Sequence, residues 1–512
     1  MPPAMIRRMR PFAVVVALGL ACTPLVAQRE SVDTAARGCL APLPVVTPLA
    51  GDLPLHRTYT RADSTARFAG CRDDAARWMA SEARLVTRSG VPDGRGSGGA
   101  PATIGSTLHL RGGFELRLGI AQLRIAPEII AASNADFLTF PGRDLTRSSF
   151  ASPFYTGRHS ADLPSRPGLA TLLRVDPGES GLWILRPRYA VSVTSGLPDW
   201  GPGVGEGLVL GRSTAGLPRL ELATWRPLGD AQLRLRWFGG VAVESRFFDT
   251  TARNDRRNIA GLRLTYERAH WTLGVSRTVM EGRSGAELRT ALKPLQRASS
   301  DTVIEMLAAD LLFANRATGS FAWVEGARQV PLRSFRDFTL MPTEGLALRV
   351  GASQRLAQSA AAQWILSAEA VRLDQPPQRS GRAPQDFYTS PLVVQGWTHR
   401  GQPLGSGLGP GGQRQFISLD REGRTWHLGG FLERMRWNDD ALYREFLAYQ
   451  NRHDVSVQLG LRAGRRLPSG QFVDVSLSAG QRLNYLFQND DFLAGYRTDD
   501  VRFAQLSLTL HP

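Results

Sequence analysis

The chain has 512 residues, of which 42% are hydrophobic and 21% are charged, and its 62 basic and 46 acidic residues give a net charge of +16. Beyond position 27 it contains no uncharged apolar run of about 18 residues, which excludes a membrane-spanning helix in the mature chain. The basic balance admits three kinds of partner: nucleic acid, an anionic membrane surface or an acidic polymer.

The N-terminus has the pattern of a secretory signal peptide, residues 1–27. Arg7, Arg8 and Arg10 form a basic beginning, and the apolar run that follows, residues 12–21, is too short to span a bilayer as a helix. We predict cleavage after Ala27. Export argues against nucleic acid as the partner, and removal of three arginines leaves 59 basic and 46 acidic residues, a net charge of +13.

A lipoprotein signal stays open as an alternative. Cys22 follows Gly19-Leu20-Ala21, and a lipoprotein signal normally has Leu where Gly19 stands.

Residues 28–104 are rich in Pro and Ala and differ from the rest of the chain. We predict a helix over residues 72–86, because apolar side chains recur there on one face at helical spacing, namely Ala75, Trp78, Met79, Leu85 and Val86. Asp73 and Asp74 would place negative charge in its first turn, which suits the helix dipole. We expect this segment to be periplasmic.

Two cysteines follow the signal peptide, Cys39 and Cys71. In an oxidising compartment they are expected to form one disulfide. Two separate buried thiols remain the alternative. No His lies near either Cys at ligand spacing, so a zinc site is not supported.

From about residue 105 the apolar residues alternate with polar ones, as in Leu233, Leu235 and Trp237 or in Leu506, Leu508 and Leu510. A soluble β-sandwich shows the same alternation. Three features favour a membrane barrel: the alternating strands fill most of the chain, aromatic residues such as Trp237, Tyr266 and Trp271 end apolar faces, and the polar faces are rich in Arg and Gly. We predict an all-β fold, an antiparallel transmembrane β-barrel of about 16–18 strands over residues 105–512. Its ending, His511-Pro512, departs from the aromatic residue that commonly ends such barrels.

The most distinctive motif is Trp200-Gly201-Pro202-Gly203, which opens a glycine-rich stretch that runs to residue 210 and includes Glu206. The spacing does not match a dinucleotide-binding fingerprint, and no Lys stands ready for a phosphate. The glycines indicate close backbone approach or positive φ angles. A tight reversal inside the barrel and a groove in which Trp200 stacks on a sugar ring both remain open.

A second motif, Trp397-Thr398-His399-Arg400-Gly401-Gln402-Pro403-Leu404-Gly405, precedes a glycine-rich loop at residues 405–412. Arg400 disfavours the cationic form of His399, so a general-base role is conceivable. No carboxylate nearby completes a catalytic group, and a structural junction between a strand and a loop is the simpler interpretation. We find no catalytic centre.

Taken in order, several segments resemble the capsule assembly protein Wzi family. They are Asp162-Leu163-Pro164, Asp176-Pro177-Gly178-Glu179-Ser180, the two motifs above, Gly216-Leu217-Pro218-Arg219, residues 364–373 with a central Glu369, and Leu432-Glu433-Arg434. The resemblance covers roughly residues 105–512. It implies an outer-membrane barrel of about 18 strands, with helices at its periplasmic end, that captures capsular polysaccharide. Arg212-Ser213-Thr214-Ala215 departs from the Asn-rich turn expected of the family.

We therefore expect a non-enzymatic outer-membrane protein, a monomer without cofactor or metal, that binds or anchors acidic surface polysaccharide and assists capsule assembly. The candidate ligand-binding residues are Trp200, Glu206, Trp397, His399 and Arg400. A porin-like diffusion channel is the main alternative. A secreted β-rich carbohydrate-active enzyme is the third, and it would require two carboxylates at glycosidase spacing.

Overall fold

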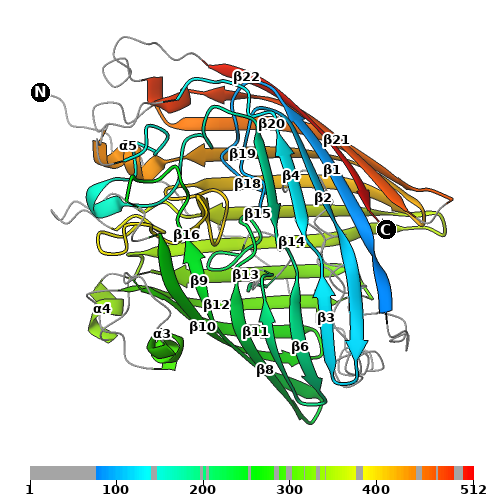
Figure 1. Cartoon of the computed structure of the whole chain (residues 1–512). Helices are drawn as coiled ribbons and strands as arrows, with labels where there is room; N and C mark the ends of the chain where they lie inside the picture. Colours follow the sequence, from blue (N-terminus) through cyan, green and yellow to red (C-terminus); the bar gives the residue numbers. More distant parts are fainter. Residues whose placement is uncertain are drawn as a thin grey trace, which may run out of the picture.

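The strands form one closed antiparallel barrel (Figure 1). The computed structural model describes residues 76–511 apart from gaps at 140–146, 197–199, 203–206, 252–254, 282–287, 296–302, 316, 330–334, 341, 376–384, 446–451, 469–470 and 489–499. Each wall strand pairs with its neighbour in the sequence, and the first pairs with the last, Leu85 opposite Leu508. The predicted fold class is confirmed: the barrel has 18 strands.

Two wall strands are interrupted, so twenty strand elements make the eighteen wall strands. The wall consists of β1 (Ala76–Arg88), β2 (Gly105–Leu118), β3 (Ala121–Ile125) continued by β4 (Glu128–Ala132), β5 (Leu172–Asp176) continued by β6 (Gly181–Arg186), β7 (Tyr189–Thr194), β8 (Arg219–Leu228), β9 (Ala231–Val243), β10 (Arg256–Arg268), β11 (Trp271–Glu281), β12 (Val303–Asn315), β13 (Ser320–Arg328), β14 (Leu346–Gln358), β15 (Ala362–Arg372), β18 (Gln413–Gly423), β19 (Trp426–Trp437), β20 (Asp454–Arg466), β21 (Phe472–Leu483) and β22 (Val501–His511).

The two interruptions face each other, at Ala126-Pro127 and at residues 177–180. Proline cannot donate a ladder hydrogen bond, which ends β3. Gly178 has a φ of +56°, and a Cβ there would lie 2.4 Å from the carbonyl oxygen of Ala126. Ser180 Oγ accepts the hydrogen bond of the Ala126 backbone N–H at 2.9 Å. The Asp-Pro-Gly-Glu-Ser motif is therefore a wall bulge.

Connections differ in length between the two ends of the barrel. One end, the short-turn end, carries tight turns such as Gly119-Ile120 and Gly229-Asp230, together with the first and last described strand ends. The other, the long-loop end, carries long connections and the short elements η1 (Gly157–His159), α3 (Leu288–Leu292), η2 (Lys293–Leu295), α4 (Phe335–Leu340), β16 (Thr398–His399), β17 (Gln402–Pro403), α5 (Asp439–Glu445) and η4 (Tyr485–Gln488). In Figure 1 the long loops gather at the left and the C-terminus lies at the right.

The described helices gather at one end of the barrel. Within the described part of the chain, α3, α4 and α5 lie at the long-loop end, opposite the end at which the described chain begins and finishes. None of the described helices is long and apolar enough to cross a membrane.

The helix predicted over residues 72–86 is wrong from residue 76 onward, where the chain forms β1. The register of β1 against β2 shifts between Met79 and Glu82. This bulge reverses which alternate side chains face outward: Trp78 is exposed before it, and Leu85 after it. Because of this shift, the outward-facing apolar residues of β1 are spaced in the sequence as they would be on one face of a helix. The barrel therefore includes residues from 76, earlier than the predicted start at 105.

The wall has an apolar outside and a charged inside. Leu459, Leu461, Leu506 and Leu508 are exposed outward, whereas the residues between them on β20 and β22 are buried and mostly polar. Exposed aromatic side chains gather near the short-turn end at Trp78, Tyr189, Trp271 and Trp364, as in an interfacial girdle. Trp237, expected at a strand end, lies in the middle of β9.

Candidate functional site

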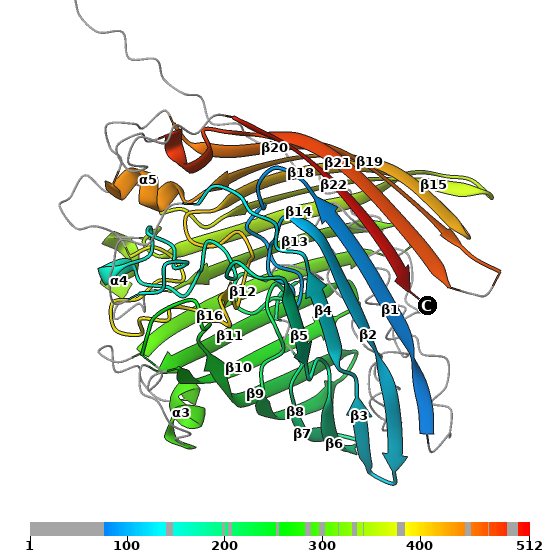
Figure 2. The ribbon, with the colours of Figure 1, turned by 45° about the horizontal axis from the view of Figure 1, so that its top comes forward.

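The lumen at the long-loop end is filled by the chain itself. Two connecting segments fold inward and are here called the plug: residues 195–218, apart from 197–199 and 203–206, and residues 385–412 (Figure 2). Their buried apolar side chains form one core with inward-facing side chains of the wall: Trp200, Leu208, Leu217, Phe387, Trp397 and Leu404 from the plug, and Phe238, Met280, Met306, Val371 and Met435 from the wall. Such packing excludes water from this part of the lumen.

Trp200 anchors the first plug segment. Its indole packs edge-on against Phe238, with ring centroids 5.2 Å apart. Gly261 on β10 makes room, because a Cβ there would lie 2.6 Å from the Trp200 ring. The Trp200 backbone N–H donates to the carbonyl oxygen of Leu210 at 3.1 Å, so the chain returns on itself between these two residues. Only 2% of Trp200 is exposed, and no face of its ring is open to an external sugar. Glu206 lies outside the described residues.

Trp397 and His399 anchor the second plug segment, and both are fully buried. The Trp397 indole N–H donates to the carbonyl oxygen of Val209 at 2.8 Å, which joins the two segments. His399 Nδ1 accepts the backbone N–H of Val243 at 2.9 Å, at the end of β9. Burial, and secondarily the charge of Arg400, lowers the pKa of His399 to about 3. His399 is therefore neutral, and its contacts are those of a structural junction.

A row of alternating charges, here called the ionic ladder, lines the inner wall beside the plug. Glu433 binds Arg95 at 2.9 Å and Arg414 at 2.5 Å. Arg414 also binds Glu369 at 2.5 Å, and Glu369 binds Arg349 at 2.7 Å. These residues come from β19, β18, β15 and β14 and from the loop after β1. Each charge faces opposite charges, which offsets the cost of burial.

The ladder ends on the plug. Glu325 on β13 lies 3.8 Å from Arg349 and accepts the backbone N–H of Leu208 at 2.9 Å. Leu208 in turn accepts from the Tyr388 hydroxyl at 2.5 Å. Glu369 and Glu433, both within segments that carried the resemblance, are thus ladder residues that position the plug rather than ligands.

A further buried carboxylate ties the plug to the neighbouring loops. Asp162 accepts from the backbone N–H and the hydroxyl of Ser245, at 2.5 and 2.6 Å. Burial raises the pKa of Asp162 to about 7. Gln402 of the plug donates to the Ser213 carbonyl at 2.9 Å.

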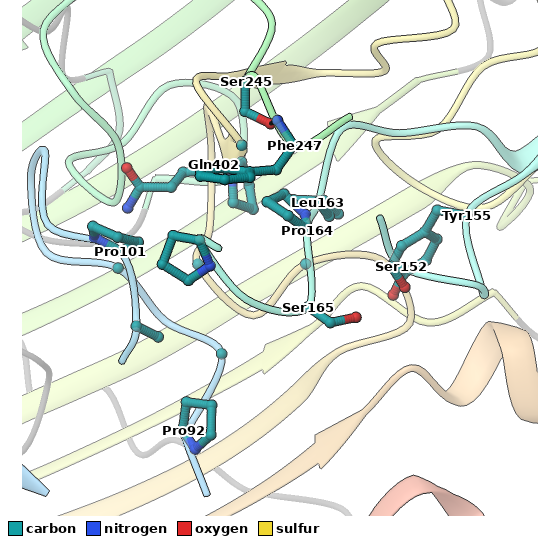
Figure 3. A pocket seen from close by; sticks show the side chains of 18 of the residues that line it. Pro92, Pro101, Ser152, Tyr155, Leu163, Pro164, Ser165, Ser245, Phe247 and Gln402 are labelled. Atoms are coloured by element: carbon teal, nitrogen blue, oxygen red, sulfur yellow. Dashed lines mark hydrogen bonds between the residues drawn. The ribbon is translucent and has the colours of Figure 1, made fainter. Parts of the chain in front are cut away.

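Above the plug lies a cavity of about 520 Å³, within the usual range for small-molecule sites, about 300–1,000 Å³. It is lined by five connections, by strand residues that include Arg174 and Arg482, and by residues 400–403 and 407–410 of the plug. Figure 3 shows Pro101 on one side and Tyr155 and Ser152 on the other, with Phe247 and Gln402 between. Of the predicted ligand-binding residues that the structure describes, Arg400 alone lines this cavity.

Four arginines line the cavity, and three hold carboxylates. Arg400 and Arg174 both bind Asp176, and Arg482 binds Asp454 at 2.6 Å. Arg246 is exposed, and its guanidinium lies 4.8 Å from the centre of the Phe247 ring. Among the described residues no carboxylate forms an ion pair with it. Arg246 and Phe247 carry no sequence signal, because they stand in an ordinary connection between two strands.

No group of His, Cys, Asp or Glu side chains within the described ranges could hold a metal ion. Cys39 and Cys71 lie outside those ranges, so their disulfide stays a prediction.

Comparison with known proteins gives a likeness of fold. No model of a protein family matches the chain, and no curated protein matches it. Among solved structures it is similar to Wzi of Escherichia coli, described as an outer-membrane protein involved in group 1 capsule assembly and as a carbohydrate-binding β-barrel. That match has 12% identity, covers 94% of this chain and 98% of that one, and has a TM-score of 0.56.

OccAB1 of Acinetobacter baumannii, at 9% identity and a TM-score of 0.41, covers 86% of this chain and 97% of its own. The match to OccK11 of Pseudomonas aeruginosa has 10% identity and a TM-score of 0.40, and it covers 85% of this chain and 95% of that one. The resemblance seen in the sequence is confirmed at the level of the fold: the chain is an outer-membrane β-barrel of eighteen strands with the fold of Wzi.

Proposed function

We propose that this barrel binds acidic surface polysaccharide at its long-loop end, without catalysis, and so helps to hold a capsule at the cell. The observation that carries the proposal is the cavity of about 520 Å³ above the plug. Outer-membrane barrels have short periplasmic turns and longer extracellular loops. By this rule the long-loop end, and with it the cavity, faces the outside of the cell.

The chemistry of the lining suits a sugar acid. The partly exposed ring of Phe247 offers a flat apolar face to a pyranose, and exposed polar groups offer hydrogen bonds. Arg246, held against Phe247, offers a charge-assisted pair of hydrogen bonds to a carboxylate. The description of the similar barrel as carbohydrate-binding supports this assignment.

The plug argues against the porin-like alternative. A solute would have to pass a core in which Trp200 and Trp397 are buried at 2% and 0% exposure. We expect the purified protein, reconstituted in planar bilayers, to show little conductance. Stable large channels would favour the diffusion pore instead.

Two measurements test binding directly. Purified protein is titrated with a polysaccharide rich in uronic acids and, as a control, with a neutral one of similar length. Preference for the acidic polymer, weakened by salt, is expected. In the source cell, deletion of the gene should release capsule into the medium, and capsule that stays attached at the normal level would contradict the proposal.

A further inference from the structure

The short segment α3–η2 (Leu288–Leu292 with Lys293–Leu295) lies against the outside of the wall, on β9, β10 and β11. Both ribbon views draw α3 beside β10 (Figures 1 and 2). Leu264 on β10 and Val275 on β11 face outward and are 44% and 59% exposed. Ala260 and Val279, each four residues away on the same strand face, are 0% and 2% exposed. Something outside the wall therefore covers them.

Direct contacts identify the cover as α3–η2. The indole N–H of Trp237, on the outward face of β9, donates to the carbonyl oxygen of Ala291 at 2.7 Å. Gly239 lies directly below, since a Cβ there would be 3.1 Å from the Ala291 side chain. Ala260 and Val279 do not belong to the core inside the barrel.

The cover hides charged groups on the outer face. Arg277 binds Glu305 at 2.6 Å and donates to the carbonyl oxygen of Pro294 at 3.1 Å. Glu281 binds Lys293. Glu281 and Glu305 are only 6% and 5% exposed, although their strand positions point away from the lumen.

These charges stand at membrane depth. Arg277 follows Trp271, a girdle residue, by six positions along β11. At about 3.3 Å per residue and a strand tilt near 40°, that is roughly 15 Å along the barrel axis. The apolar band of such barrels is about 25 Å tall. Without a cover, Arg277 and Glu305 would therefore face hydrocarbon.

We propose that α3–η2 is a lipid-facing cover that completes the apolar band in this sector of the barrel. Its outward side chains, Leu292 and Leu295, are 48% and 64% exposed and continue the exposed belt of Leu264 and Val275. Their partner is the acyl-chain region of the leaflet at the long-loop end. The segment thus acts as a membrane contact and not as part of the ligand-binding loops.

Spin labelling of the full chain in phosphatidylcholine vesicles tests the proposal. In a background with Cys39→Ser and Cys71→Ser, single labels are placed at Leu292→Cys and Leu295→Cys. Val275→Cys serves as the lipid reference and Arg158→Cys, on an exposed loop, as the aqueous reference. Labels at 292 and 295 should be accessible to oxygen and protected from a water-soluble nickel chelate, as at 275.

Accessibility to the nickel chelate as high as at 158 would overturn the proposal. Each labelled protein is first checked by its heat-dependent gel mobility, which shows that the barrel has folded. Hydroxyl-radical footprinting of the unsubstituted protein in the same vesicles needs no variant. There Leu292 and Leu295 should be as weakly oxidised as Val275, and oxidation at the level of exposed loop residues would likewise contradict a lipid contact.

Discussion

The carboxylate of Glu433 binds the guanidinium of Arg95 at 2.9 Å, although 338 residues separate them in the chain. The contact joins the loop after β1 to the inner wall at β19. It also joins two charges that are almost completely buried.

Glu433→Gln should destabilise the barrel, because it leaves Arg95 and Arg414 without the charge between them. Breaking a buried pair by removing one partner costs about 3–5 kcal/mol. Urea unfolding in vesicles measures the loss. Glu267→Gln is the matched control, since Glu267 lies 3.8 Å from Arg234 in a partly exposed pair worth about 0–1 kcal/mol. Equal losses in the two variants would show that the ladder does not hold the structure.

Gly261→Ala should disturb the plug. The added Cβ would lie 2.6 Å from the Trp200 ring and 2.5 Å from Phe238, and overpacking of this kind costs about 1–3 kcal/mol. Gly326→Ala, on β13, is the control, because a Cβ there meets nothing within 4 Å. Thermal unfolding followed by gel mobility distinguishes them. A Gly326 variant that loses as much stability as the Gly261 variant would refute the steric explanation.

His399 should make stability depend on pH. Its pKa is about 3 in the folded barrel and about 6.5 when unfolded. As pH falls, His399 takes up a proton in the unfolded chain before it does so in the folded barrel, which favours unfolding. The contribution of neutral His399 to the free energy of unfolding is therefore complete above about pH 6.5 and is lost as pH falls toward 3. The slope is at most about 1.4 kcal/mol per pH unit. Urea midpoints at pH 7 and pH 5 should therefore differ more for the natural protein than for His399→Gln.

Asp162 should make the barrel less stable as pH rises, which is the opposite of the effect of His399. Burial raises its pKa to about 7, above the usual value near 4, so the folded barrel holds this proton more tightly than the unfolded chain. Its contribution is present below about pH 4 and is lost as pH rises through 7. The stability of the natural protein relative to Asp162→Asn should thus fall between pH 4 and pH 7. A constant difference across that interval would contradict the raised pKa.

Arg246→Ala should weaken binding of an acidic polysaccharide by roughly tenfold or more, since a hydrogen bond to a charged group contributes about 1.5–3 kcal/mol. Arg188→Ala removes the same charge from an exposed turn at the opposite end and should leave affinity unchanged. Isothermal titration with the purified barrel compares the two. Similar losses would mean that net charge, and not the cavity, governs binding.

Some interpretations of the sequence failed for local reasons. The bulge between Met79 and Glu82 reverses the alternation of β1, so a strand resembled a helix. Trp200, Trp397 and His399 stand in the two most distinctive motifs, and the structure buries them in the plug. Distinctive glycine and aromatic motifs mark close packing as readily as ligand binding, and spacing alone does not separate the two.

The sequence by itself predicted a transmembrane barrel of about 16–18 strands, from alternating residues that fill most of the chain, aromatic residues at the ends of apolar faces, and polar faces rich in Arg and Gly. The alternation is a local pattern, because successive side chains of a strand point to opposite faces and a barrel strand has one face toward lipid and one toward the lumen. Only the tertiary structure decided that the lumen is plugged, that Glu369 and Glu433 belong to one ladder, and that Arg246 and Phe247 border a cavity. These contacts join residues far apart in the chain, and they depend on closure of the barrel, which brings distant loops together at one end.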